Sequence, residues 1–148
     1  MLPVDRTGAN GAARFAGRGI VGAMAQTGLR RVTTGLRLVR RPPPERIALE
    51  GVPALLARVP AAHRDEAIEL AHWAYGAAAG AVYATLPEPL RHPRWAGPAY
   101  GISVWLLFEA VLGPVLLGLE RTKRRPLSER LALAADHALY GAVVAKRS

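Results

Sequence analysis

The sequence contains no cysteine, which excludes a disulfide framework, a thiolate nucleophile and a thiolate metal site. Aromatic residues make up only 6%, and 11 acidic residues face 20 Lys and Arg. The net charge of +9 suits anionic lipid as well as nucleic acid, so the placement of the arginines must decide between them. The N-terminus lacks the early basic cluster, uninterrupted apolar core and cleavage site of a secretory signal. Any insertion signal is therefore expected to be a retained helix.

Two segments of the chain resemble each other. Residues 40–42 (Arg-Arg-Pro), 45–46 (Glu-Arg) and 48–49 (Ala-Leu) recur at one constant offset, as residues 124–126, 129–130 and 132–133. A second string, His-x-x-Tyr-Gly-Ala, starts at His72 and again at His137. The shorter offset of this second string means that the first copy carries an insertion near residues 50–71. We interpret the 148 residues as one domain made of two tandem helical hairpins, at about 11–86 and 95–147.

Four stretches have the composition of helices in a membrane bundle, and the sequence predicts them at residues 11–38, 66–86, 95–119 and 128–145. About 20 apolar residues are needed to cross a hydrocarbon core of about 30 Å. Residues 95–119 meet this need most clearly, because Glu109 is their one charged residue. Pro114 should kink this helix, and Ser128 is a plausible N-cap for the last one.

The first stretch is the weakest of the four. Its longest uncharged run covers residues 19–29, which is too short to span, and Arg18 and Arg30 flank it. If the helix crosses the membrane, Arg18 must extend outward to the interface or find a partner. The sequence leaves open whether this helix crosses or lies at the surface.

One arginine-rich turn joins the two helices of each hairpin. If all four helices cross the membrane, both turns lie on the same face. The positive-inside rule then places these turns in the cytoplasm, where anionic headgroups would bind them. The residues of the two turns are Arg30, Arg31, Arg37, Arg40, Arg41 and Arg46, and Arg121, Lys123, Arg124, Arg125 and Arg130.

Small residues at a spacing of four allow helix backbones to approach closely. Gly76 and Gly80 form such a pair in the second stretch, and Gly141 and Ala145 form its counterpart in the last. We predict that these pairs make the packing seam between the two copies.

Several ionisable residues fall inside the predicted spans, where a charge is costly unless it is paired or neutralised. Glu109 and His137 should lie at similar depth in an antiparallel hairpin, next to Asp136. His72 is the counterpart of His137 in the repeat, and Arg18 is a further candidate for this intramembrane polar cluster. The cluster could exchange protons near neutral pH or serve as a static network that fixes packing.

Other motifs carry little weight. Residues 17–22 match a dinucleotide-binding pattern, but no buried strand precedes them and no acidic ribose ligand follows. Glu69 and His72 have the spacing of one Glu-x-x-His pair in the metal sites of helical bundles. Such a site needs a second pair, but the second copy has Ala134 at the position that corresponds to Glu69. The basic turns accompany no recognised nucleic-acid-binding motif. We therefore expect no enzyme, no cofactor, no metal and no nucleic acid.

The string Pro43-Pro44-Glu45-Arg46-Ile47, followed by His-x-x-Tyr-Gly at residues 72–76 and again at 137–141, resembles the YagU-like group of small bacterial inner-membrane proteins. This resemblance covers most of the chain from about Gly17. It implies a multi-pass protein of the bacterial plasma membrane, and it implies no catalytic residue, because the group has no established activity.

These observations favour an all-α, four-helix integral membrane bundle built from two tandem helical hairpins. A structural or accessory role is the first hypothesis, and four short helices that enclose little space are compatible with a homo-oligomer. The alternatives are a transport or proton-relay component that uses the Glu/His cluster, and a peripheral basic protein that binds anionic lipid or RNA.

Overall fold

The computed structural model describes residues 6–39, 43–118 and 125–146, and every regular element in these ranges is helical. Four long helical rods dominate the fold. Their bounds are Arg6–Gly35 (α1), Arg64–Thr85 (α4), Ala96–Leu117 (α6, η3 and α7) and Leu127–Val144 (α9). Short segments complete the chain, namely Pro43–Arg46 (α2), Ile47–Gly51 (η1), Pro53–Leu56 (α3), Ala61–His63 (η2) and Glu88–Arg91 (α5). The predicted all-α class is confirmed.

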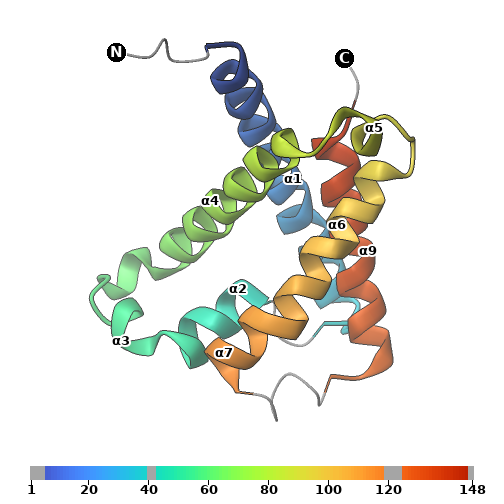
Figure 1. The fold of residues 1–148 in the computed structure, drawn as a ribbon. Coiled ribbons are helices and arrows are strands. Elements are labelled where there is room, and N and C mark those ends of the chain that lie inside the picture. The colour runs from blue at the N-terminus through green and yellow to red at the C-terminus, as the bar shows by residue number, and fades with distance from the viewer. Residues whose placement is uncertain (1–5, 40–42, 119–124, 147–148) are drawn as a thin grey trace.

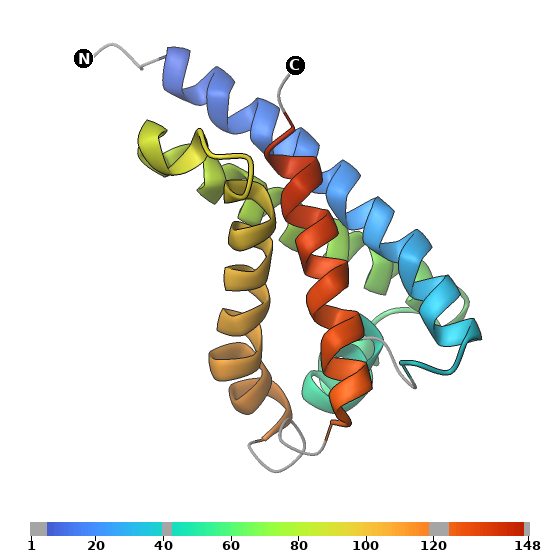
Figure 2. The ribbon, with the colours of Figure 1, turned by 90° about the vertical axis from the view of Figure 1, so that its right-hand side faces the viewer.

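The long helices alternate in direction, so α1 begins and α9 finishes at the same end of the molecule (Figures 1 and 2). Helix α1 packs against both α4 and α9, and α6 packs against α9. Helices α4 and α6 meet near the end that α5 connects, where the Tyr100 hydroxyl donates a hydrogen bond to the carbonyl of Ala79 at 2.5 Å. From there the two helices diverge (Figure 1).

The third rod is interrupted where the sequence predicts a kink. Helix α6 (Ala96–Leu107) passes into a π-helical turn, η3 (Phe108–Leu112), before α7 (Gly113–Leu117). Pro114 has no N–H to donate to the preceding turn, and a widened turn accommodates its ring. The local irregularity therefore follows from Pro114 and places Glu109 within the π-helical turn.

Two expectations about helix ends are wrong. The first helix was predicted at residues 11–38, but α1 begins earlier, at Arg6, and ends earlier, at Gly35. It ends shortly before Arg37, which adopts a left-handed φ of 58°. Helix α9 begins at Leu127 directly after Pro126, and no side chain caps its start. Ser128 is therefore inside the helix and is not its N-cap. A fixed φ at Pro126 starts this helix without a hydroxyl cap.

Among the described residues, four charged side chains are buried while many large apolar side chains are exposed. Its two buried apolar clusters are small, and they are formed by Phe15, Tyr83, Tyr140 and Val144, and by Val39, Trp105 and Leu133. Arg30, Arg125, Glu129 and Asp136 are each at most 8% exposed. Large aliphatic side chains on all four rods are instead more than half exposed, including Val32, Leu70, Val115 and Leu131.

Among the described residues, one rod is long and apolar enough to cross a membrane, and it covers Ala96–Leu117. Only 28% of its most apolar window is buried. The core helix of a soluble protein would be mostly buried, so this rod has an unusually exposed apolar surface.

Candidate functional site

A cavity of about 290 Å³ lies among the four long rods, with α2 and η1 closing one side. Its polar lining comes from α1, α4, η3 and α9, and its apolar lining comes largely from η1, α4 and the η3–α7 segment. The main polar residues are Gln26, Arg30, His72, Asp136 and His137, and the main apolar residues are Ile47, Val52, Ile68, Leu112 and Leu116. The divergence of α4 from α6 leaves room for this cavity.

Arg30 forms the centre of the polar lining. Its Nη2 contacts the His72 ring nitrogens at 2.9 and 3.2 Å and donates to the Thr27 hydroxyl at 3.1 Å. Its Nε donates to the carbonyl of Gln26 at 3.3 Å. The Thr27 hydroxyl is also 2.8 Å from Glu69 Oε2. The guanidinium is thus held between α1 and α4 by hydrogen bonds, which offset part of the cost of its burial.

The α9 side of the cavity carries Asp136 and His137. His137 Nδ1 lies 2.8 Å from the carbonyl of Leu133. Because a carbonyl only accepts, Nδ1 donates this hydrogen bond. Gln26 Nε2 donates to the backbone carbonyl of Asp136 at 3.3 Å, which ties α1 to α9. Asp136 Oδ1 is buried and has no hydrogen-bond partner.

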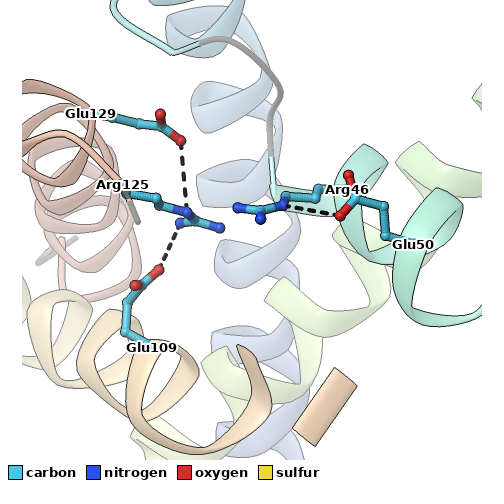
Figure 3. A network of polar contacts seen from close by, with 5 residues as sticks. All are labelled: Arg46, Glu50, Glu109, Arg125 and Glu129. Atoms are coloured by element: carbon cyan, nitrogen blue, oxygen red, sulfur yellow. Dashed lines mark hydrogen bonds and ion pairs between the residues drawn. The ribbon is translucent and has the colours of Figure 1, made fainter. Parts of the chain in front are cut away.

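Glu109 also lines the cavity, but its partner is different from those that the sequence suggested. Arg125 Nη1 donates to Glu109 Oε1 at 2.7 Å, and Arg125 Nε lies 3.7 Å from Glu129 Oε1 (Figure 3). One carboxylate from η3 and one from α9 therefore contact the same arginine, which lies just before the start of α9. Burial lowers the pKa of the Arg125 guanidinium, and both carboxylates oppose this effect.

A second ion pair approaches the first. Arg46 Nε lies 3.5 Å from Glu50 Oε2, and Figure 3 shows the Arg46 guanidinium directed toward that of Arg125. The two guanidinium groups repel each other, and this repulsion by Arg46 further lowers the pKa of the Arg125 guanidinium. Of the five residues in Figure 3, Glu109 lines the cavity and the other four do not.

The structure brings together four of the five residues of the predicted polar cluster, because Glu109, Asp136, His137 and His72 line one cavity. Arg18 does not belong to it. The Arg18 guanidinium lies 5.3 Å from the Phe15 ring centre, in a separate pocket toward the other end of α1. The three helical turns between Arg18 and Arg30 explain this separation, since each turn advances about 5.4 Å.

Arg30 and Gln26 are the site residues that the sequence did not identify. Arg30 was expected in the first basic turn, yet it is 6% exposed and directed inward. One signal was available, because Gln26 and Arg30 are four residues apart and so share a helix face.

The small-residue pairs do pack helices, but within each predicted copy rather than between the copies. Gly76 lies against Gly19 and Ala23 of α1, and a Cβ at Gly76 would stand 2.7 Å from that of Ala23. Gly141 meets Gly97 and Gly101 of α6 in the same manner. Gly80 contacts Phe15 and Gly19, and Ala145 contacts Gly97. The helix preceding each pair supplies the matching small residues.

In the described residues no group of three His, Asp or Glu side chains is placed to hold a metal ion. Glu69 bonds to Thr27, so the Glu69–His72 pair does not converge on such a site. Comparison with protein-family models, curated proteins and solved structures finds no match to this chain. The resemblance to the YagU-like group therefore stays a prediction from the quoted motifs.

Proposed function

We propose that the chain is a small integral membrane protein of the bacterial plasma membrane with a structural or accessory role, in which α1, α4, α6–α7 and α9 cross the bilayer. The observation that carries this proposal is that the long rods expose many aliphatic side chains while four charged side chains are buried between them. Ionisable residues in membrane proteins face the bundle interior and pair with one another, as Arg125 does with Glu109.

The energetics favour lipid as the solvent. Burying a Leu or Val side chain contributes about 1.5–3 kcal/mol, and many such side chains are left exposed on the four rods. In water this surface would be a large apolar patch that favours aggregation. In a bilayer the same surface needs no partner, and helices are one of the few structures that satisfy all backbone groups there.

The contacts also support the proposal of two tandem hairpins, α1–α4 and α6–α9. Gly76 and Gly141 are counterparts in the sequence repeat, and each meets the backbone of a glycine in the preceding rod. In this arrangement the duplication is parallel, and both basic turns lie on the cytoplasmic face, where they contact anionic headgroups.

Alkaline carbonate extraction tests the proposal. Membranes that contain the full chain are washed at high pH and in high salt, and the chain is measured in the pellet and in the supernatant. A bundle that crosses the bilayer stays in the pellet under both conditions. Release by either wash would instead favour a peripheral basic protein that binds anionic lipid or RNA.

One observation favours a second candidate, a transport or proton-relay component. His72, Asp136, His137 and Glu109 line a common cavity, and protons could pass among them. The test is pH-driven flux in liposomes that contain the wild-type chain or the Asp136→Asn variant. Loss of flux in this variant, with flux retained in Glu88→Gln on the exposed α5 segment, supports a relay. Absence of flux in the wild type favours the structural role.

A further inference from the structure

A second pocket lies at the end of the molecule where α1 begins, close to α5 and the end of α9 (Figure 1). Its volume is about 410 Å³, which is within the usual range for small-molecule sites. Two buried aromatic side chains, Phe15 and Tyr83, belong to its lining and are 8% and 2% exposed. The sequence analysis did not identify this pocket, because its residues come from four separate helices.

Three arginines lie close to the ring of Phe15. The guanidinium carbons of Arg14, Arg18 and Arg91 are 5.4, 5.3 and 5.8 Å from the ring centre. Arg14 and Arg18 are four residues apart on α1, a spacing at which like charges repel each other, and Arg91 comes from α5. Contact with an aromatic ring stabilises a cation but adds no negative charge. The ring therefore holds the three cations together without neutralising them.

The remaining residues of the lining do not balance this charge. Lys146, which follows α9, is a fourth basic residue. Glu88 is the one carboxylate among the described lining residues, and its Oε1 lies 3.0 Å from His92 Nε2. In the part of the chain that the structure describes, Arg14, Arg91 and Lys146 make no ion pair. The pocket therefore has an excess of positive charge.

The donors of these basic residues are accessible to a ligand. Arg14 and Lys146 are exposed, and Arg91 is half-buried. Because Nε of Arg91 is fully covered, we assign only its two terminal nitrogens to ligand binding. A planar guanidinium binds an oxyanion through two parallel hydrogen bonds, whereas the lysine ammonium is a compact charge with three rotatable donors. The pocket thus offers charged donors from α1, from α5 and from the end of α9.

A phosphate monoester suits these donors better than other common anions do. It has three strong acceptor oxygens and carries between one and two negative charges near neutral pH, so it can accept from all three elements at once. A carboxylate has two oxygens in one plane and a single charge. Arginine and lysine are also the side chains that most often bind phosphate in proteins.

We propose that this pocket binds a phosphate monoester, with Arg14, Arg91 and Lys146 as the donors to its three terminal oxygens. Arg18 lies near the same ring and is not required as a donor. Soluble phosphate monoesters and the lipid phosphatidic acid both carry this group, and the experiment below separates the two sources. The lipid source alone depends on the membrane placement proposed above.

The test uses the full chain purified in an uncharged detergent. Isothermal titration with glycerol phosphate measures binding of a soluble monoester, and titration with acetate measures binding of a carboxylate. Native mass spectrometry measures binding of phosphatidic acid. Phosphatidylglycerol is the control with a phosphate diester, and diacylglycerol is the control without phosphate.

Four variants locate the binding site. Arg14→Gln and Arg91→Gln each remove one charged donor of the pocket. Arg94→Gln is the matched control, because Arg94 is exposed and follows α5 but does not line the pocket. Glu88→Gln removes the carboxylate of the lining and should therefore have the opposite effect to the two pocket arginines.

We expect saturable binding of glycerol phosphate or of phosphatidic acid, with one site per chain. Arg14→Gln and Arg91→Gln should each weaken this binding about tenfold, as the loss of a hydrogen bond between charged groups does, and Arg94→Gln by less than about twofold. Glu88→Gln should strengthen it about twofold, because a repulsive charge is removed. Binding of glycerol phosphate identifies a soluble ligand, and binding of phosphatidic acid alone identifies a lipid.

Three results would each overturn the inference: no saturable binding of either monoester, equal losses in Arg91→Gln and Arg94→Gln, or binding of acetate or phosphatidylglycerol as tight as that of the monoesters. Arg14→Gln keeps the test decisive if Arg91→Gln does not fold, because Arg14 is exposed. Release of the chain by alkaline extraction contradicts the membrane placement, and the titration with glycerol phosphate then still tests the pocket.

Discussion

Helix α1 allows a matched test of the seam between α1 and α4, because it contains glycines in close contact and glycines in open space. A Cβ at Gly19 would collide with the backbone carbonyl of Gly76 and stand 3.2 Å from Ala77 Cα. A Cβ at Gly28 or Gly17 would meet nothing within 4 Å. The obstruction at Gly19 is backbone, so no side-chain rotation relieves it.

The magnitude follows from two opposing effects. Replacing a glycine in a helix interior by alanine stabilises the helix by about 1 kcal/mol at any of these positions. Overpacking at Gly19 costs about 1–3 kcal/mol, because α1 and α4 must separate. The unfolding free energies of Gly19→Ala and Gly28→Ala should therefore differ by about 1–3 kcal/mol, and the propensity term cancels between them.

Thermal unfolding of both variants in one detergent, followed by circular dichroism, measures this difference. At about 2–4 °C per kcal/mol, Gly28→Ala should unfold a few degrees above wild type and several degrees above Gly19→Ala. Gly17→Ala, two residues from the seam position, should behave as Gly28→Ala does. If Gly19→Ala is as stable as Gly28→Ala, the close approach of α1 and α4 is refuted.

Two further pairs of variants test the polar contacts. Glu109→Ala leaves the guanidinium of Arg125 buried with only the longer contact to Glu129, and it should lower the unfolding free energy by about 3 kcal/mol in a chemical denaturation. Glu88→Ala, which breaks the exposed pair with His92, should have no measurable effect in that assay, and equal effects would contradict the inward position of Glu109. Tyr140→Phe removes a 2.6 Å hydrogen bond to the carbonyl of Gly76 and should cost about 1 kcal/mol. Its repeat counterpart Tyr75→Phe should cost less, since the described residues give the Tyr75 hydroxyl no hydrogen bond, and a reversed order would count against the α4–α9 contact.

Several features of the fold could be predicted from local sequence. Apolar runs bounded by prolines located the long helices, because proline cannot continue a helix and a long apolar run needs a nonaqueous environment. Pro114 indicated the irregular turn in the third rod. The small-residue pair at Gly76 and Gly80 was identified as a packing surface because only a missing side chain allows such a close approach.

The partners of these features could not be predicted from the sequence. Small pairs occur on every long helix, so spacing alone does not say that Gly76 packs against Gly19 rather than against the second copy. Arg30 and Arg125 were both placed in basic turns, since a charge beside a proline-rich connection usually faces solvent. Which face of α1 turns inward depends on the whole bundle, and its many Gly and Ala residues give that helix little amphipathic pattern.

Cysteine accessibility measures the number of membrane crossings, because single cysteines can be introduced into a chain that has none of its own. Single cysteines replace Asn10, Pro43, Arg91, Lys123 and Ser148, and intact cells are treated with a membrane-impermeant maleimide before and after permeabilisation. With four crossings, we expect labelling of positions 10, 91 and 148 in intact cells, and labelling of positions 43 and 123 only after permeabilisation. Labelling of positions 10 and 43 from the same side, or of all five before permeabilisation, would rule out four crossings.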